Sequence, residues 1–222
     1  MYAFSALGAL FLSALIVEAV GANWSDVWNA LLDGSLRKPG RWGRTLGSAV
    51  PMAMVAVGTI ISSKVGLINI GQEGQMLVGA AFGAYVGAHM PGPGPLVIVA
   101  VIIGGFVGGA FWSGLAGALR YWRNVPEVLT TLLLVTVAAN LVGYGLKNTW
   151  LLLDPDAAVG NRTQVSPQLS PDSRLPRIDL FGNNFSLSVV ISLVLIILIS
   201  WMLSQTIVGF RLSVVGQNQK VG

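Results

Sequence analysis

The residues best suited to chemistry form one short polar run in an otherwise apolar chain. Residues 69–75 read NIGQEGQ. The run holds one carboxylate, three side-chain amides and two glycines: Asn69, Gly71, Gln72, Glu73, Gly74 and Gln75. Such groups are costly at membrane depth, so they face a cavity, a partner or a pathway, and non-helical backbone is tolerated there only where protein or water surrounds it. The run predicts a broken or re-entrant element near residues 66–79 that lines a pathway; a polar turn at the membrane surface is the alternative.

A second polar group lies further along the chain, where residues 124–127 read NVPE. Asparagine is a good helix cap, proline suits the first turn, and Glu127 would meet the positive end of the helix dipole. Thr130 and Thr131 follow in the expected helix. They could face a substrate path or hydrogen-bond to neighbouring helices, and the second role is the more common one.

The sequence contains no signature of catalysis. It has neither the H-E-x-x-H and G-x-S-x-G patterns nor a phosphate-binding G-x-x-x-x-G-K-[ST] loop. There is no cysteine, and the single histidine, His89, precedes a Pro-Gly-Pro-Gly turn. We therefore expect no enzyme activity, no metal and no cofactor in this chain, and any ATPase would be a separate subunit.

The composition is that of a membrane protein. Hydrophobic residues make up 54% of the 222 residues and charged residues 10%, whereas a soluble domain carries roughly 25% charged residues. Spanning a bilayer takes about 20 mostly apolar residues. The net charge of +4 is scattered over the loops, which fits contact with membrane lipid headgroups rather than nucleic acid.

Hydrophobic patterning predicts an all-α, polytopic helix bundle that forms one domain over residues 1–222. We expect about six spanning or partly spanning segments: 1–21, 45–63, 76–90, 96–119, 126–146 and 186–208. Residues 147–185 contain four prolines and predict an extramembrane loop. Small residues recur every four positions in two segments, at Gly79, Gly83 and Gly87 and at Gly105, Gly109, Ser113 and Gly117, which favours close helix packing.

Orientation does not follow from charge. Alternation places residues 64–75, 120–125 and 209–222 on one side, and residues 22–44, 91–95 and 147–185 on the other. Basic residues are more numerous on the second side, but its long loop is a poor guide under the positive-inside rule. The remaining basic residues are split almost evenly.

Four stretches, in order, resemble bacterial ABC importer permeases of the nucleoside and simple-sugar branch. GLINIGQEGQMLVGAAFGAYVG at 66–87 resembles the family's N-I-G-x-E-G-Q signature, and VPEVLTTLLL at 125–134 resembles its N-E-V-I-S-T-L-M-L motif. GANWSDVWNALLDGS at 21–35 is similar to the segment after the family's first helix, and GFRLSVVGQNQKVG at 209–222 is similar to its G-x-x-L-R-A-V-G-x-N-P-x-A-A element. Together these motifs extend over nearly the whole chain.

The resemblance implies a multi-pass subunit of the bacterial inner membrane that moves a nucleoside or related simple sugar inward. It implies three kinds of partner: cytoplasmic ABC ATPase subunits, a second permease that forms a mixed pair with this one, and an extracytoplasmic substrate-binding protein. It also implies that residues 69–75 lie near the translocation pathway and that residues 209–222 form a cytoplasmic coupling region. The coupling residues would be Gly209, Arg211, Gly216 and Asn218.

Some positions depart from the family pattern. Pro126 replaces the usual asparagine, and Ser213 and Gln219 replace the common alanine and proline of the coupling element. Family members continue with several more helices, so we expect a fragment or truncated product whose N-terminus is also incomplete. Two alternatives stay open: a secondary transporter or facilitator, which needs no ATPase, and a truncated remnant that transports nothing.

Overall fold

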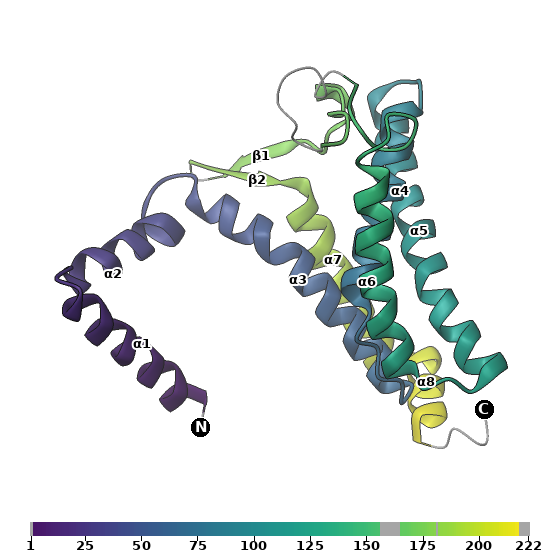
Figure 1. The fold of residues 1–222 in the computed structure, drawn as a ribbon, viewed down its shortest axis with the longest axis horizontal. Coiled ribbons are helices and arrows are strands. Elements are labelled where there is room, and N and C mark those ends of the chain that lie inside the picture. The colour runs from purple at the N-terminus through teal and green to yellow at the C-terminus, as the bar shows by residue number, and fades with distance from the viewer. Residues whose placement is uncertain (1, 156–164, 181, 218–222) are drawn as a thin grey trace. The chain divides into compact units, whose positions relative to one another are not determined.

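The computed structural model describes residues 2–155, 165–180 and 182–217 (Figure 1). The backbone divides into two compact units. Unit 1 comprises residues 1–50 and 177–189, and unit 2 comprises residues 51–176 and 190–222. Helix α3 (Arg41–Lys64) and helix α7 (Leu187–Gln205) each begin in unit 1 and continue into unit 2.

Unit 1 combines two N-terminal helices with a small β-hairpin. Helix α1 (Tyr2–Ala19) is followed by α2 (Trp24–Leu32) and by a π-helical turn, η1 (Asp33–Arg37). Asn23 caps α2, because its side-chain oxygen accepts a hydrogen bond from the Ser25 amide. Strands β1 (Arg177–Leu180) and β2 (Asn183–Ser186) pair antiparallel.

Unit 2 is built from helices. Its elements are the remainder of α3, then α4 (Gln72–His89), α5 (Gly94–Arg123), α6 (Glu127–Gly145), the 3-10 turn η3 (Pro171–Ser173), the remainder of α7 and α8 (Ile207–Gln217). Within this unit, α8, the start of α6 and the ends of α3 and α5 lie at one end (Figure 1). The turn between α4 and α5 lies at the opposite end, where α5 also contacts η3.

Glycines allow α4 and α5 to pack closely. A Cβ added to Gly79 would stand 2.8 Å from the carbonyl oxygen of Gly105, and one added to Gly83 would stand 3.1 Å from that of Val101. The two backbones therefore approach as the four-residue spacing predicted. Gly117, at the far end of the α5 series, has no atom within 4 Å of its virtual Cβ, so the close packing stops before that position.

The buried core of unit 2 is small and lies where α4, α5 and α6 meet. Val78, Trp112 and Ala138 form it, and Leu115 and Leu134 pack against it. Each of the three helices supplies one member, so the core fixes the spacing of the helix trio. This trio carries the polar run and the threonines singled out above.

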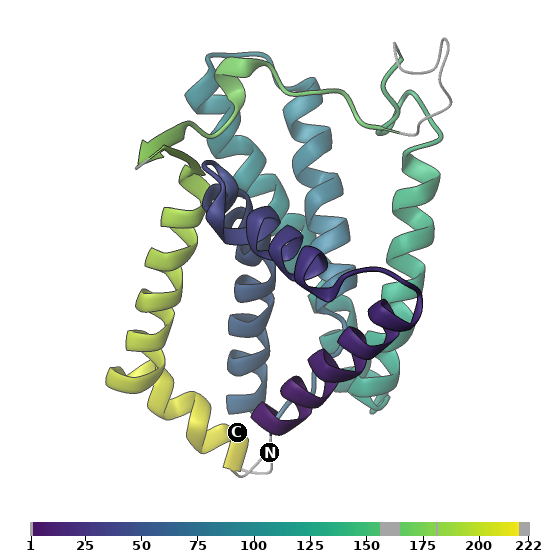
Figure 2. The same cartoon turned by 90° about the vertical axis from the view of Figure 1, so that its left-hand side faces the viewer.

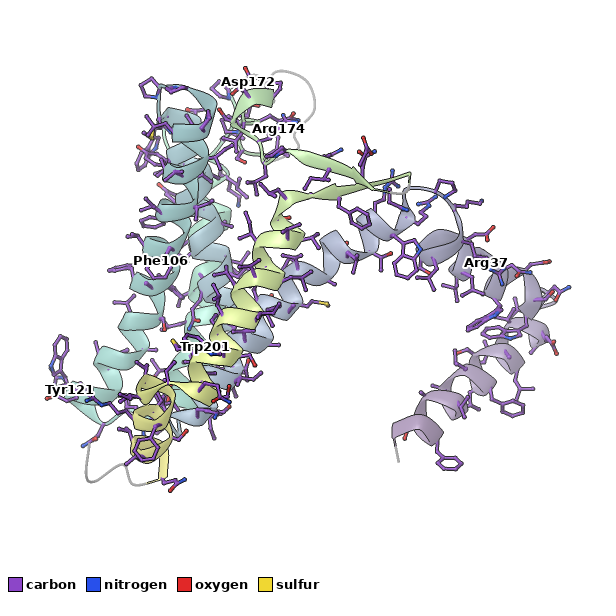
Figure 3. The ribbon with its side chains drawn as sticks, turned by 180° about the vertical axis from the view of Figure 1, so that it is seen from behind. Arg37, Phe106, Tyr121, Asp172, Arg174 and Trp201 are labelled. Carbon is purple, nitrogen blue, oxygen red and sulfur yellow. The ribbon has the colours of Figure 1, made fainter. Side chains whose placement is uncertain are left out.

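Apolar side chains cover much of the surface. Phe106 on α5 is 77% exposed and Ile197 on α7 is 66% exposed, and side chains such as Phe106 and Trp201 stand out from their helices (Figure 3). Patches of this extent are unfavourable in water and suit lipid or partner subunits. In the described part of the chain, four helices are long and apolar enough to cross a membrane: α3, α5, α6 and α7.

The structure confirms the all-α, polytopic class and places a helix in each of the six apolar segments. It also forms elements that the sequence did not predict: α2, the β1–β2 hairpin and α8. The capping role expected for Asn124 was wrong. Asn124 ends α5 in a left-handed conformation (φ 52°), and Pro126 occupies the N-cap position of α6.

Candidate functional site: a broken helix held against α6

The polar run forms an extended segment followed by a helix start. After α3 ends at Lys64, residues 67–71 have no regular secondary structure, and α4 begins at Gln72. The N–H group of Ile70 donates to the Thr131 hydroxyl (3.4 Å). Thr131 is the fifth residue of α6, so non-helical backbone lies beside the second turn of a helix that is long and apolar enough to span a membrane. This geometry fits the predicted broken element, and Figure 2 shows the break between α3 and α4 from a second side.

Asn69 organises the turn that starts α4. Its side-chain oxygen accepts a hydrogen bond from the Gly71 amide at 2.8 Å. Its amide also lies 3.4 Å from the side-chain amide of Gln75, the fourth residue of α4. Asparagine is well suited to this role, because its short side chain can bond to backbone two residues ahead.

The two glycines are required by close approach to α6. A Cβ at Gly71 would lie 3.0 Å from the Thr131 Cβ, and one at Gly74 would lie 3.0 Å from the Val135 Cα. The Trp112 indole N–H donates to the Leu134 carbonyl (3.3 Å) beside Gly74. Larger residues would separate α4 from α6, so these glycines allow the short distance between the polar run and α6.

The remaining polar groups of the run point away from α6. Gln72 donates to the Thr59 hydroxyl of α3 at 2.9 Å. Glu73 is exposed and makes no hydrogen bond or ion pair within the described residues. It lies in the first turn of α4, where the helix dipole favours a negative charge. Of the run, Glu73 is therefore the group most available to a partner or a passing ligand.

The three residues predicted in the fifth apolar segment lie together at the start of α6. The Glu127 carboxylate is 3.8 Å from the guanidinium of Arg120, at the end of α5. Thr130 and Thr131 are buried, and their hydroxyls donate to the backbone carbonyls of Pro126 and Glu127. Thr131 is the link to the polar run, whereas Thr130 is confined to α6 in the contacts that the structure describes.

Three of the four predicted coupling residues lie on α8, beyond a bend after α7 (Figure 2). Gly209 is buried against the backbone of Leu203, and Gly216 is so close to the carbonyl of Lys64 that a Cβ would collide with it. Arg211 is exposed. Asn218 lies outside the described residues. The structure thus brings α8 to the end of α3, next to the segment that leads into the polar run.

Sequence reasoning missed Thr59 and Trp112 as partners of the polar run, because neither has a local pattern that points to it. It also missed an apolar cavity of about 440 Å³ between α4, α5 and α6, lined by residues such as Phe82, Phe111 and Leu141. Such a lining offers little to the hydroxyls and ring nitrogens of a nucleoside. The polar run and this cavity are therefore chemically separate sites.

Comparison with known proteins agrees with this architecture. A family model described as the permease component of branched-chain amino acid transport systems matches residues 43–221, which is most of the chain. The chain belongs to this permease family. Together with its apolar helices, membership makes it a multi-pass protein of the inner membrane.

Three relatives of this permease are named as ABC transporter permeases. One is the glucose permease of Haloferax volcanii, 27% identical over 96% of this chain and 57% of its own length. The guanosine permease of Bacillus subtilis is 26% identical over 93% of this chain and 58% of its own. The nucleoside permease of Lactococcus lactis is 27% identical over 93% of this chain and 57% of its own. The permease thus spans little more than half of each relative's length, and no solved structure matches it.

Proposed function

We propose that this chain is a membrane-spanning permease subunit of an ATP-driven ABC importer for a nucleoside or a related simple sugar. The observation that carries the proposal is the agreement of three relatives, all named as ABC permeases and all matching over more than nine-tenths of the chain. The structure supports it with a broken helix packed on α6 and with exposed apolar helices. The alternative function, a secondary transporter or facilitator, has no comparable support.

The proposed mechanism is alternating access. The chain offers different contacts in outward- and inward-facing states, and ATP binding and hydrolysis on partner subunits shift the balance between them. Residues 69–75 would line the pathway, with Glu73 turned toward it. A second permease chain would complete that pathway, and an extracytoplasmic binding protein would deliver the substrate.

The proposed coupling element is α8. Its Gly216 touches the backbone at the end of α3, and α3 leads directly into the polar run. A displacement of α8 by an ATPase subunit would therefore be transmitted to the pathway through packed backbone rather than through flexible side chains. Arg211 is exposed on the same helix and is available for contact with that subunit.

The experiment that tests this proposal is co-purification of the ATPase subunit with the permease. Arg211→Ala should reduce the amount of ATPase retained, since it removes an exposed charge from the proposed contact. Arg174→Ala is the matched control, because Arg174 is also exposed but lies at the opposite end of unit 2 (Figure 3). Equal retention by the wild type and Arg211→Ala would rule out the assignment of Arg211.

A further inference from the structure

Unit 1 contains a polar pocket of about 420 Å³ at the start of α3. Six residues line it: Gly40, Gly43, Arg44, Arg177, Asn184 and Ser186. They come from the residue before α3, from its first turn and from both strands of the hairpin. The lining is thus dominated by two guanidinium groups with an amide and a hydroxyl beside them.

Two glycines allow the hairpin and the start of α3 to come together and form this pocket. Gly40 adopts a left-handed conformation (φ 80°), and its N–H group donates to the Asn183 side chain at 3.0 Å. Gly43 lies against the backbone carbonyl of Asn184, where a Cβ would collide. The hairpin is therefore held directly on the first turn of α3. In the hairpin, Arg177 is opposite Ser186, so their side chains share one face of the sheet.

Neither arginine of the pocket forms an ion pair within the described residues. The ion pairs there join Lys38 to Asp33 and Arg120 to Glu127, and neither Arg44 nor Arg177 takes part in one. Asp179 shares the sheet face of Arg177 but does not line the pocket. Both arginines are exposed, so an anion can reach them from outside.

Chain connectivity places this pocket at the membrane boundary. Arg44 lies in the first turn of α3, and Ser186 directly precedes α7; both helices are long and apolar enough to span a bilayer. Trp42, beside the pocket in sequence, is 47% exposed, and tryptophan is enriched at the level of the lipid headgroups. A ligand in this pocket therefore lies at the depth of the headgroup phosphates.

The apolar side of α2 agrees with this position. Trp24 and Trp28 stack with their ring centroids 6.1 Å apart, and Leu31 continues the same face one turn later, 55% exposed. Asp26 and Asn29 lie on the other side of the helix. An amphipathic helix with tryptophan on its apolar face is typical of a segment that lies in the membrane interface.

We propose that the pocket binds the phosphate of an anionic phospholipid headgroup. Guanidinium groups bind phosphate oxygens in a planar, two-pronged geometry, and the Asn184 amide and the Ser186 hydroxyl can donate to the remaining headgroup oxygens. The cationic end of a zwitterionic headgroup would meet the same two guanidinium groups and be repelled. The pocket therefore selects a headgroup with net negative charge and anchors the membrane entry of α3 and α7.

The test is native mass spectrometry of the full chain released from micelles that contain equal amounts of phosphatidylglycerol and phosphatidylcholine. The wild type should retain mainly phosphatidylglycerol, and millimolar inorganic phosphate should not displace it. The double variant Arg44→Gln/Arg177→Gln should lower the ratio of bound phosphatidylglycerol to phosphatidylcholine by roughly tenfold, because two charge-assisted contacts are lost.

The control is Lys38→Gln/Arg41→Gln, which removes two positive charges at the entry to α3 but leaves every residue of the pocket in place. It should keep the wild-type ratio. An equal fall in this control would assign the effect to general surface charge and overturn the proposal. Displacement by inorganic phosphate would assign the pocket to free anions instead of lipid. A wild type that binds the two lipids in the proportions of the micelle would overturn the proposal without any variant.

Discussion

At the scale of residues, the polar run has two faces with different roles. Gly71 and Gly74 face α6, where close backbone contact and the hydrogen bond from the Ile70 amide to Thr131 join the run to that helix, and Asn69 holds the turn through its bond to the Gly71 amide. Glu73 faces outward and has no partner within the described residues. Substitutions on the inner face should therefore disturb folding, and substitutions on the outer face should disturb function.

Glu73→Gln tests the outer face. The variant should unfold at nearly the same temperature as the wild type, because no described contact depends on the carboxylate and the loss of its interaction with the helix dipole is small. Uptake should fall several-fold if the charge takes part in gating. Glu18→Gln is the matched control, since Glu18 is another exposed glutamate, in α1. Unchanged uptake by Glu73→Gln at normal expression would exclude a role for the charge.

The sequence was sufficient to single out these residues but not their contacts. The cluster of carboxylate, amides and glycines between apolar segments indicated a broken element, and the structure has one. The contact with Thr131 could not be predicted, since it joins residues 61 positions apart. At Asn124 the local pattern gave a wrong prediction. Its residue type suits a cap for α6, but Asn124 ends α5 in a left-handed turn.

At the scale of elements, glycine contacts hold α4 against α5. Gly79→Ala should lower stability by about 1–3 kcal/mol, the usual cost of overpacking, because its Cβ would press on the Gly105 backbone carbonyl at 2.8 Å. The backbone cannot turn aside as a flexible side chain would. The midpoint temperature of thermal unfolding in detergent measures this effect.

Gly117→Ala is the control for that prediction. Gly117 belongs to the same small-residue series, but its added Cβ meets nothing within 4 Å. Its midpoint should stay the same or rise slightly, since alanine favours helix more than glycine does. Equal losses in the two variants would mean that helix packing does not distinguish the two positions.

Long apolar elements were predictable, and short ones were not. Each of the six apolar segments forms a helix, because length and hydrophobicity decide that outcome with little help from tertiary contacts. Helix α2 and the hairpin are short and partly polar, so their formation depends on local caps and on docking to α3. Helix α8 was concealed because its 11 residues include two glycines, which weaken any helix signal.

At the scale of the whole molecule, the segments that connect the helices of unit 2 lie at its two ends. The turn between α4 and α5 and the segment around η3 lie at one end, and α8 lies at the other (Figure 1). The family resemblance predicts that the α8 end is cytoplasmic. Because the chain has no cysteine, single cysteines can report this orientation without background labelling.

Asp172→Cys and Gln217→Cys are suitable positions, since both residues are exposed. Asp172 belongs to η3 (Figure 3) and Gln217 is the last residue of α8, so they belong to elements at opposite ends of unit 2. A membrane-impermeant maleimide should label Asp172→Cys in intact spheroplasts and Gln217→Cys only after permeabilisation. The cysteine-free wild type controls for unspecific reaction, and labelling after denaturation controls for expression. The reverse pattern would invert the proposed orientation.

Uptake of labelled nucleoside into cells that lack this gene distinguishes an ATP-driven importer from a facilitator. The cells are complemented with the gene, together with either an active or a catalytically inactive ATPase subunit, and ribose is added as competitor. For an ATP-driven importer of nucleosides, uptake should be restored by the gene, lost with the inactive ATPase and unaffected by ribose. Restored uptake that persists with the inactive ATPase would contradict the importer proposal and identify a facilitator.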